Sequence, residues 1–185
     1  DSLTGHSLAS LTRHPELWFD DASVILVAEA MSFRVHRSIL CKPSSVLSDI
    51  LSIPQPPDNG SETIEGCPVR THDSAHELAQ LLKACYDPYF PQEAKYISLD
   101  YALSILRLST KYHMPAFRRR SFDELKKYFP SDSLASLVGY KCKYWHGVKS
   151  PNLELIRAIS IARESGALEL LPFIFARLCN VSLEE

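Results

Sequence analysis

The chain has 185 residues, which suits one domain, or one domain with a helical appendage, and is long enough to bury a hydrophobic core. Hydrophobic residues make up 45% and charged residues 23%, a globular balance that excludes disorder for most of the chain. The formal net charge of -2 excludes a molecule whose whole surface attracts nucleic acid.

Cysteine usage and hydropathy indicate the compartment. The five cysteines are widely spaced and form no CxxC pair, whereas a small secreted disulfide scaffold carries a denser and usually even set. No apolar run approaches the ~20 residues that span a bilayer, and no basic-then-apolar signal segment is visible. These features predict an intracellular protein with reduced thiols, cytoplasmic or nuclear, that does not insert in a membrane.

The first part of the chain predicts an arm and a hairpin. Residues 1–13 are largely polar and predict an arm or a short helix. The apolar run Val24–Val27 predicts a buried strand. Phe33 and Val35 alternate with polar neighbours, which is the period of a second strand, so the two runs form a hairpin. A third short strand is predicted over residues 67–71.

Two short helices are predicted after the hairpin. The first covers Arg37 to Leu40 and stops before Pro43, and the second is capped by Ser44 or Ser45. Residues 53–66 hold three prolines and two glycines, so we expect a flexible insertion loop there.

Helices dominate the middle of the chain. Asp73 or Ser74 is expected to cap an amphipathic helix whose apolar positions stand at i, i+3, i+4 and i+7, namely Leu78, Leu81, Leu82 and Cys85. After a short extended piece at residues 96–99, Asp100 is expected to cap a helix that runs to Lys111.

The last third is predicted to be entirely helical. One helix opens at Pro115, at a first-turn position where proline is tolerated, and another covers residues 131–145. A helical hairpin follows: its first helix runs from Pro151 to a terminating Gly166, and its second carries Leu168, Leu171, Phe175 and Leu178. Few strands early and many helices late predict an α+β fold, a small three-stranded sheet packed on a helical cluster.

Several segments, in order, carry a family resemblance. The stretch from Trp18 to Leu51 reads WFDDASVILVAEAMSFRVHRSILCKPSSVLSDIL: an acidic-then-apolar strand, a hairpin, Val-His-Arg, a Ser pair and an amphipathic helix. Further on come ELAQLLKACYD and YALSILRLSTKYHMPAFRRRSFDEL. Together these segments resemble a BTB/POZ domain over residues 14–129. The pieces HPELWFDD, EGCPV and ARESGALELLP resemble the subfamily expanded in mushroom-forming fungi.

The resemblance implies a BTB/POZ-like domain over residues 14–129 and an all-helical extension over 130–185. It also implies a non-enzymatic module that self-associates, as a homodimer, and recruits a partner protein. Leu17, Trp18 and Phe19 have two interpretations, packing in the core or burial at a subunit interface. The candidate interface residues are Leu17, Trp18, Phe19, Asp21, His36 and Arg37.

One position departs from the family pattern. In that family an aspartate directly before the first strand pairs with the arginine of the His-Arg motif, in a charged pocket near the dimer interface. An ungapped alignment from Phe33 places Ser23 there, with Asp21 and Asp20 two and three residues earlier. Either a small shift lets Asp21 reach Arg37, or the pocket is altered and a family-style dimer is in doubt.

Basic residues cluster late in the family-like region. The candidate basic surface comprises Arg118, Arg119, Arg120, Lys126 and Lys127. A nucleic-acid site needs such a patch together with aromatic platforms or a helix that reads a groove. A solvated helix face is the favoured interpretation, an acidic protein partner is an intermediate one, and nucleic acid is not expected.

Metal and catalytic interpretations have weaker support. Cys142 and His146 stand one helical turn apart, but with Cys179 and His113 they form no second close pair, so a zinc site is not expected. No nucleophile motif, phosphate loop or paired-carboxylate arrangement occurs. We expect no enzyme activity, cofactor, metal or small-molecule substrate.

Three alternative functions remain open beside a self-associating module. One is a substrate adaptor for a cullin-type ubiquitin ligase, for which no contact motif can be placed within residues 86–97. Another is a transcription-linked regulatory factor that uses the basic surface. The third is an enzyme of unrecognised type, which would need a deep pocket lined by perturbed ionisable groups.

Overall fold

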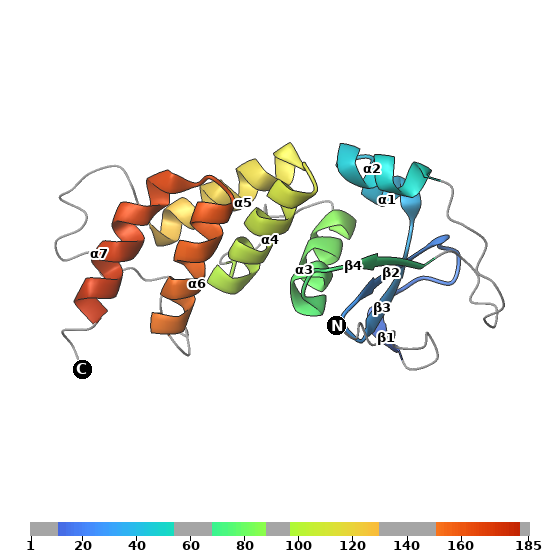
Figure 1. Ribbon diagram of the computed structural model, residues 1–185, viewed down its shortest axis with the longest axis horizontal. Helices are drawn as coiled ribbons and strands as arrows, with labels where there is room; N and C mark the ends of the chain where they lie inside the picture. Colours follow the sequence, from blue (N-terminus) through green and yellow to red (C-terminus); the bar gives the residue numbers. More distant parts are fainter. Residues whose placement is uncertain (1–10, 54–67, 88–96, 130–150, 182–185) are drawn as a thin grey trace, which may run out of the picture. The chain divides into compact units, whose positions relative to one another are not determined.

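The computed structural model describes residues 11–53, 68–87, 97–129 and 151–181 (Figure 1). The chain packs as two compact units, Asp1–Pro88 and Tyr89–Glu185, and each is described by itself. All the described strands belong to the first unit, and the described elements of the second unit are helical. This distribution confirms the predicted α+β class and the helical C-terminal part.

The centre of the first unit is the predicted hairpin. Strand β2 (Val24–Ala28) pairs antiparallel with β3 (Met31–Val35) from Val24↔Val35 to Ala28↔Met31. Every residue of β2 is buried, as expected for an apolar strand with no polar alternation. The turn places Glu29 at φ 52°, a left-handed backbone conformation that residues other than glycine and asparagine rarely adopt.

The sheet has four strands, so the prediction of three was one strand short. The segment expected to belong partly to an arm forms β1 (Thr12–Trp18), which pairs parallel with β3. The register shifts between Arg13 and Trp18, so the strand is bulged there. Pro15 lies in this shifted part of an edge strand, where a missing N–H donor is tolerated.

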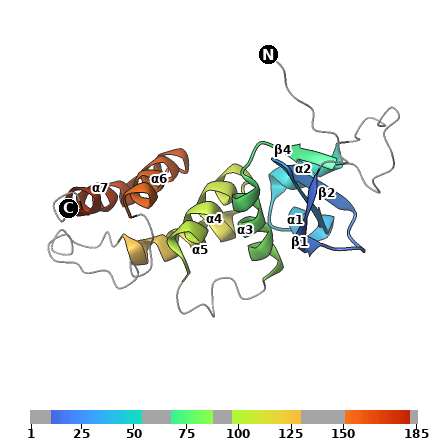
Figure 2. The same cartoon turned by 90° about the horizontal axis from the view of Figure 1, so that it is seen from below.

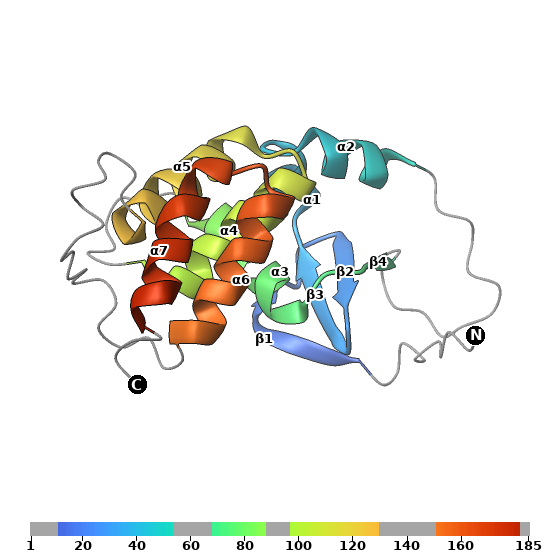
Figure 3. The ribbon, with the colours of Figure 1, turned by 60° about the vertical axis from the view of Figure 1, so that its left-hand side comes forward.

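The predicted third strand is β4 (Pro68–Thr71), which pairs parallel with β2. The sheet order is therefore β1-β3-β2-β4, and Figure 3 shows the strands in that order. With β2 and β3 in the middle, the side chains of Leu26 and Phe33 are almost completely buried.

Helices α1 (Arg37–Cys41) and α2 (Ser45–Ser52) follow the hairpin as predicted and lie together at one end of the sheet (Figures 1 and 3). Ser44 caps α2, because its hydroxyl accepts a hydrogen bond from the backbone N–H of Leu47 at 3.0 Å. The position of Pro43 between the two helices agrees with the predicted break.

Helix α3 (Ala75–Tyr86) contacts the sheet through β1 and β2 and buries Leu78, Leu81 and Leu82, as the periodicity predicted. Its cap differs from the prediction. Ser74 occupies the N-cap position, but its side chain makes no capping hydrogen bond. Instead, the carboxylate of Glu29 accepts from the backbone N–H of Ala75 at 3.1 Å, so the hairpin turn caps the helix.

In the second unit, α4 (Leu99–Lys111) and α5 (Pro115–Tyr128) pack against each other (Figure 2). Pro115 begins α5 as predicted. The extended piece expected at residues 96–99 is shorter, because Leu99 already belongs to α4. Ser98, not Asp100, caps α4: its hydroxyl accepts from the N–H of Tyr101 at 3.2 Å.

The predicted helical hairpin consists of α6 (Pro151–Glu164), a 3-10 turn η4 (Leu168–Leu170) and α7 (Leu171–Val181). Gly166 separates them at φ 67°. Figures 1 and 3 show α6 and α7 side by side. Leu168, predicted to belong to the second helix, lies instead in the 3-10 turn that precedes it. Leu168 and Phe175 are exposed, whereas Leu170 and Ile174 are buried.

Three predicted features lie mostly or wholly outside the described residues: the N-terminal arm at 1–13, the insertion loop at 53–66, and the helix at 131–145. Among the residues that the structure does describe, no helix is long and apolar enough to cross a bilayer.

Candidate protein-interaction site

Three rings in the first unit form an aromatic cluster. The ring of Phe19 stacks on Tyr86, with centroids 4.7 Å apart and planes at 24°. The imidazole of His36 lies 5.3 Å from the Phe19 ring and 5.8 Å from the Tyr86 ring, both in tilted geometry. Residues from the loop before β2, the end of β3 and the end of α3 thus meet at one place.

Hydrogen bonds fix the orientation of the His36 ring. The hydroxyl of Tyr86 accepts from the backbone N–H of His36 at 2.8 Å and lies 2.8 Å from its Nδ1. On the other side of the ring, Nε2 lies 3.1 Å from the Asp21 carboxylate. In the neutral ring the satisfied arrangement has Tyr86 donating to Nδ1 and Nε2–H donating to Asp21, so one tautomer is selected.

This network positions side chains more than it stabilises the fold. The hydrogen bond from His36 lowers the pKa of the Asp21 carboxyl, whereas burial raises the pKa of Tyr86. The side chain of Asp21 is 83% exposed, and ion pairs in water contribute little to stability. Tyr86 was not among the predicted site residues. Its place at the end of the helical segment ELAQLLKACYD was the one available signal, and nothing in that pattern pairs it with His36.

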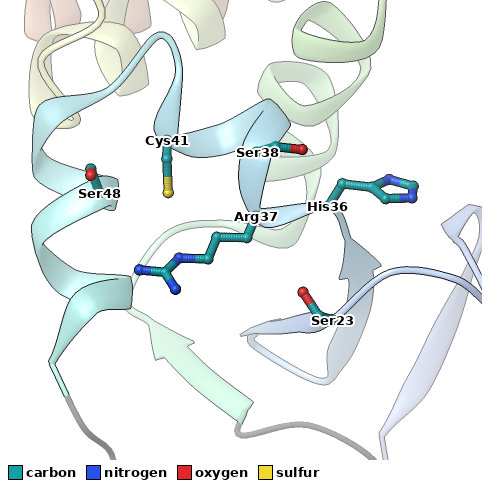
Figure 4. Close-up of a pocket in the computed structure, with 6 residues that line it drawn as sticks. All are labelled: Ser23, His36, Arg37, Ser38, Cys41 and Ser48. Carbon is teal, nitrogen blue, oxygen red and sulfur yellow. The ribbon is translucent and has the colours of Figure 1, made fainter.

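Arg37 does not meet Asp21, and the carboxylate pairs with His36 instead. Arg37 lines a pocket of about 460 Å³ together with Ser23, His36, Ser38, Cys41 and Ser48 (Figure 4). Ser23 thus lines the same pocket as Arg37, as the ungapped alignment predicted, but it brings a hydroxyl rather than a carboxylate. Figure 4 shows Arg37 extending toward α2 while the His36 ring points away from it.

The surroundings differ among the three apolar residues before β2, namely Leu17, Trp18 and Phe19. Leu17 is only 3% exposed and packs inside its own unit, which favours the core interpretation for this residue. Trp18 and Phe19 keep part of their surface exposed. The guanidinium of Arg13 lies over the Trp18 ring at 4.6 Å from its centroid, a cation–π contact that holds the indole.

Much of the candidate basic surface on α5 is engaged within the second unit. Arg118 donates to the backbone carbonyl of Ser165 at 2.9 Å. Lys127 pairs with Glu124 at 2.7 Å, and Lys126 lies over the ring of Phe122. Arg119 and Arg120 are exposed, and Arg120 also has an interaction partner. These contacts leave fewer free cations than the sequence cluster indicated.

The three cysteines that the structure describes form no disulfide. Cys41, Cys85 and Cys179 are free thiols, and burial raises the pKa of Cys85 to about 12, so this thiol is unreactive at neutral pH. Within the described ranges no three metal-ligating side chains come together. Cys142 and His146 lie outside those ranges.

The fold and the site define a small α+β module whose candidate site is a partly exposed aromatic and charged surface, a type of surface that suits protein binding. The BTB/POZ domain family model matches residues 14–128, more than half of the chain, and the chain belongs to this family. BTB/POZ domains are generally protein–protein interaction modules and generally not enzymes. A comparison with curated proteins finds no sequence that matches this chain.

Proposed function

We propose that this chain is a non-enzymatic interaction module that forms a homodimer and recruits a partner protein. The observation that carries the proposal is the partly exposed aromatic surface at Trp18 and Phe19, held rigid by Arg13, Tyr86 and the His36–Asp21 contact. Rigid aromatic side chains lose little conformational entropy on binding and contribute much of the energy of protein interfaces. We place the dimer contact at Trp18, Phe19, Asp21, His36 and Arg37.

The edge position of β1 supports the same surface. An edge strand has unpaired backbone groups on one side, which a second chain can approach. The bulge in β1 and its charged residues, including the exposed ion pair of Glu16 with Lys83 at 2.7 Å, oppose unrestricted sheet extension. We therefore expect a defined dimer in which side chains at the start of the domain are buried, rather than open-ended strand addition.

The test is sedimentation velocity of the full chain and of single variants. We expect Trp18→Ala and Phe19→Ala to weaken self-association by about 2 kcal/mol each, in the range of interface hot spots. The matched control is Phe175→Ala, because Phe175 is also an exposed aromatic (48%) but lies on α7. Wild-type self-association in both N-terminal variants, or equal weakening in the control, would contradict the proposed surface.

The finer alternatives lack a specific structural observation. Most of residues 86–97, the segment considered for a cullin contact, lies outside the described residues. A transcription-linked role would use a basic surface that is largely engaged in contacts within the chain. The proposed kinship with the mushroom-forming fungal subfamily rests on HPELWFDD, EGCPV and ARESGALELLP alone. Affinity capture that recovers a cullin with the full chain would favour the adaptor role over a simple dimer.

A further inference from the structure

The pocket between Ser23, α1 and α2 has the chemistry of an anion site. Its lining residues are Arg37, Ser23, Ser38, Ser48, Cys41 and His36, whose ring points away from Arg37, and none of them carries a carboxylate (Figure 4). Figure 4 shows Arg37 lying between Ser23 on one side and Cys41 and Ser48 on the other. A cation surrounded by neutral polar groups favours a negatively charged ligand.

The hydrogen bonds of Arg37 leave most of its donors available. Its Nη2 donates to the hydroxyl of Ser52 at 3.0 Å, and that hydroxyl donates to the Ser48 carbonyl at 2.6 Å. This arrangement anchors the guanidinium to α2 through a neutral acceptor. Among the described residues Arg37 has no other polar partner, so four of its five N–H donors are available.

Acidic residues near the pocket do not neutralise this charge. The carboxylate of Asp21 is held by Nε2 of His36. Asp49 follows Ser48 on α2 but does not line the pocket. The hydroxyls of Ser23 and Ser48 make no side-chain hydrogen bond with any part of the chain that the structure describes, so they are available as donors beside Arg37.

We propose that this pocket binds an oxyanion presented by a partner protein, the carboxylate or phosphoryl group of a side chain, with Arg37 as its main donor. Ser23 and Ser48 supply hydroxyl donors on either side. The proposal rests on the proposed interaction function and names the chemistry by which a partner is recognised. An arginine with several free donors suits planar carboxylates and phosphoryl groups equally, so the two sources share one recognition chemistry.

The test is an NMR titration of the deuterated, 15N-labelled full chain with sodium phosphate and, separately, sodium acetate. Sodium chloride keeps the ionic strength constant. We expect saturable shifts of the Arg37 Nε–Hε signal and of the Ser38 and Ser48 amides. Saturation by both anions supports carboxylate and phosphoryl ligands alike, and saturation by phosphate alone assigns the site to phosphorylated partners. Shifts with neither anion, or equal shifts with chloride, would overturn the proposal.

Two variants and a control separate the pocket from general surface charge. Arg37→Gln removes the cation, and Ser23→Asp places a competing carboxylate in the pocket, so each should weaken phosphate binding by about tenfold or more. Arg70→Gln, at an exposed position of β4, should bind phosphate as the wild type does. Undiminished binding by Ser23→Asp, with an otherwise wild-type spectrum, would overturn the proposal even if Arg37→Gln proved misfolded.

The titration and the self-association measurement test two different proposals, and either proposal can be overturned without the other. Small anions reach the pocket of an isolated chain, so the titration does not require a partner. Because Arg37 also lies at the proposed dimer contact, the titration is repeated on Trp18→Ala, in which that contact should be open. A chain that self-associates but binds neither anion overturns the oxyanion site alone. A chain that binds phosphate but never self-associates overturns the homodimer alone.

Discussion

His14 is buried in the shifted part of β1, where its ring accepts backbone hydrogen bonds that a neighbouring strand would otherwise accept. Its Nδ1 accepts hydrogen bonds from the backbone N–H groups of Glu16 and Leu17, each at 3.2 Å. Its ring stacks on Phe33 with centroids 5.3 Å apart. The bulge removes these N–H groups from the ladder with β3, and buried backbone donors need an acceptor. The histidine therefore makes an irregular strand compatible with a buried position.

The pH dependence of stability tests this role at the scale of one residue. Burial, followed by the charge of Lys83, lowers the pKa of His14 below 6.5, so the unfolded chain takes up the proton first. The His14 contribution is therefore fully present above pH 6.5 and is lost as the pH falls through the folded-state pKa. His14→Asn keeps an acceptor that does not titrate. By urea denaturation, the wild type should lose stability relative to this variant when the pH falls from about 7.5 to about 5.5.

The other histidines are common to both proteins and cancel in the comparison. A stability difference between wild type and His14→Asn that stays constant across this pH range would show that His14 titrates normally in the folded chain.

The hairpin turn and α3 form one unit at the scale of elements. Glu29 is in the left-handed region and at the same time caps α3 through the N–H of Ala75. A left-handed conformation costs a non-glycine residue about 1 kcal/mol, and a helix cap contributes about 1 kcal/mol. The two effects nearly cancel, so the turn keeps a strained glutamate because its side chain serves another element.

A substitution series at Glu29 separates the two effects. Glu29→Ala keeps the strain and loses the cap, so it should destabilise the chain by about 1 kcal/mol. Glu29→Gly loses the cap but also relieves the strain and should fall within about 0.5 kcal/mol of wild type. Glu29→Gln keeps the hydrogen bond but not the charge and should cost about 0.5 kcal/mol. Equal losses in the alanine and glycine variants, measured by chemical denaturation, would exclude strain at this position.

Local sequence patterns predicted the helices and strands better than they predicted the contacts between them. The apolar run of β2 and the periodic leucines of α3 determine these elements within a few residues of chain, and both predictions are confirmed. β1 was missed because Arg13, Pro15 and Glu16 conceal the alternation of a strand, which forms here only by pairing with β3. The start of the final helix was wrong because the 3-10 turn Leu168–Leu170, which has no distinct sequence signal, precedes α7.

Contacts across long sequence separations were not predictable from one sequence. Asp100 was expected to cap α4, but its carboxylate pairs with Arg157 of α6, which also donates to the Ser104 hydroxyl at 2.9 Å. Arg107 likewise pairs with Glu164 at 2.9 Å. For the same reason the cluster of Phe19, His36 and Tyr86 emerges only in the folded unit, although the motif containing His36 and Arg37 was identified from the sequence.

At the scale of the whole molecule, the boundary between the two compact units and the end of the family match fall at different positions. The BTB/POZ match ends at residue 128, whereas the compact second unit contains α4 and α5 together with α6 and α7. The Arg157 and Arg107 pairs join the C-terminal helices to α4. We therefore propose that residues 130–185 extend the helical part of the domain rather than forming an independent module, while 14–129 remains the proposed interaction domain.

The homodimer is the central claim about the whole molecule, and the solution mass tests it most directly. Multi-angle light scattering over a concentration series that reaches tens of micromolar should give a mass that rises toward twice the 20.9 kDa of one chain. The same series with Phe175→Ala should superimpose on the wild type, whereas Trp18→Ala should shift toward the mass of one chain. A wild-type mass of 20.9 kDa at every concentration would contradict self-association and leave the fold unaffected.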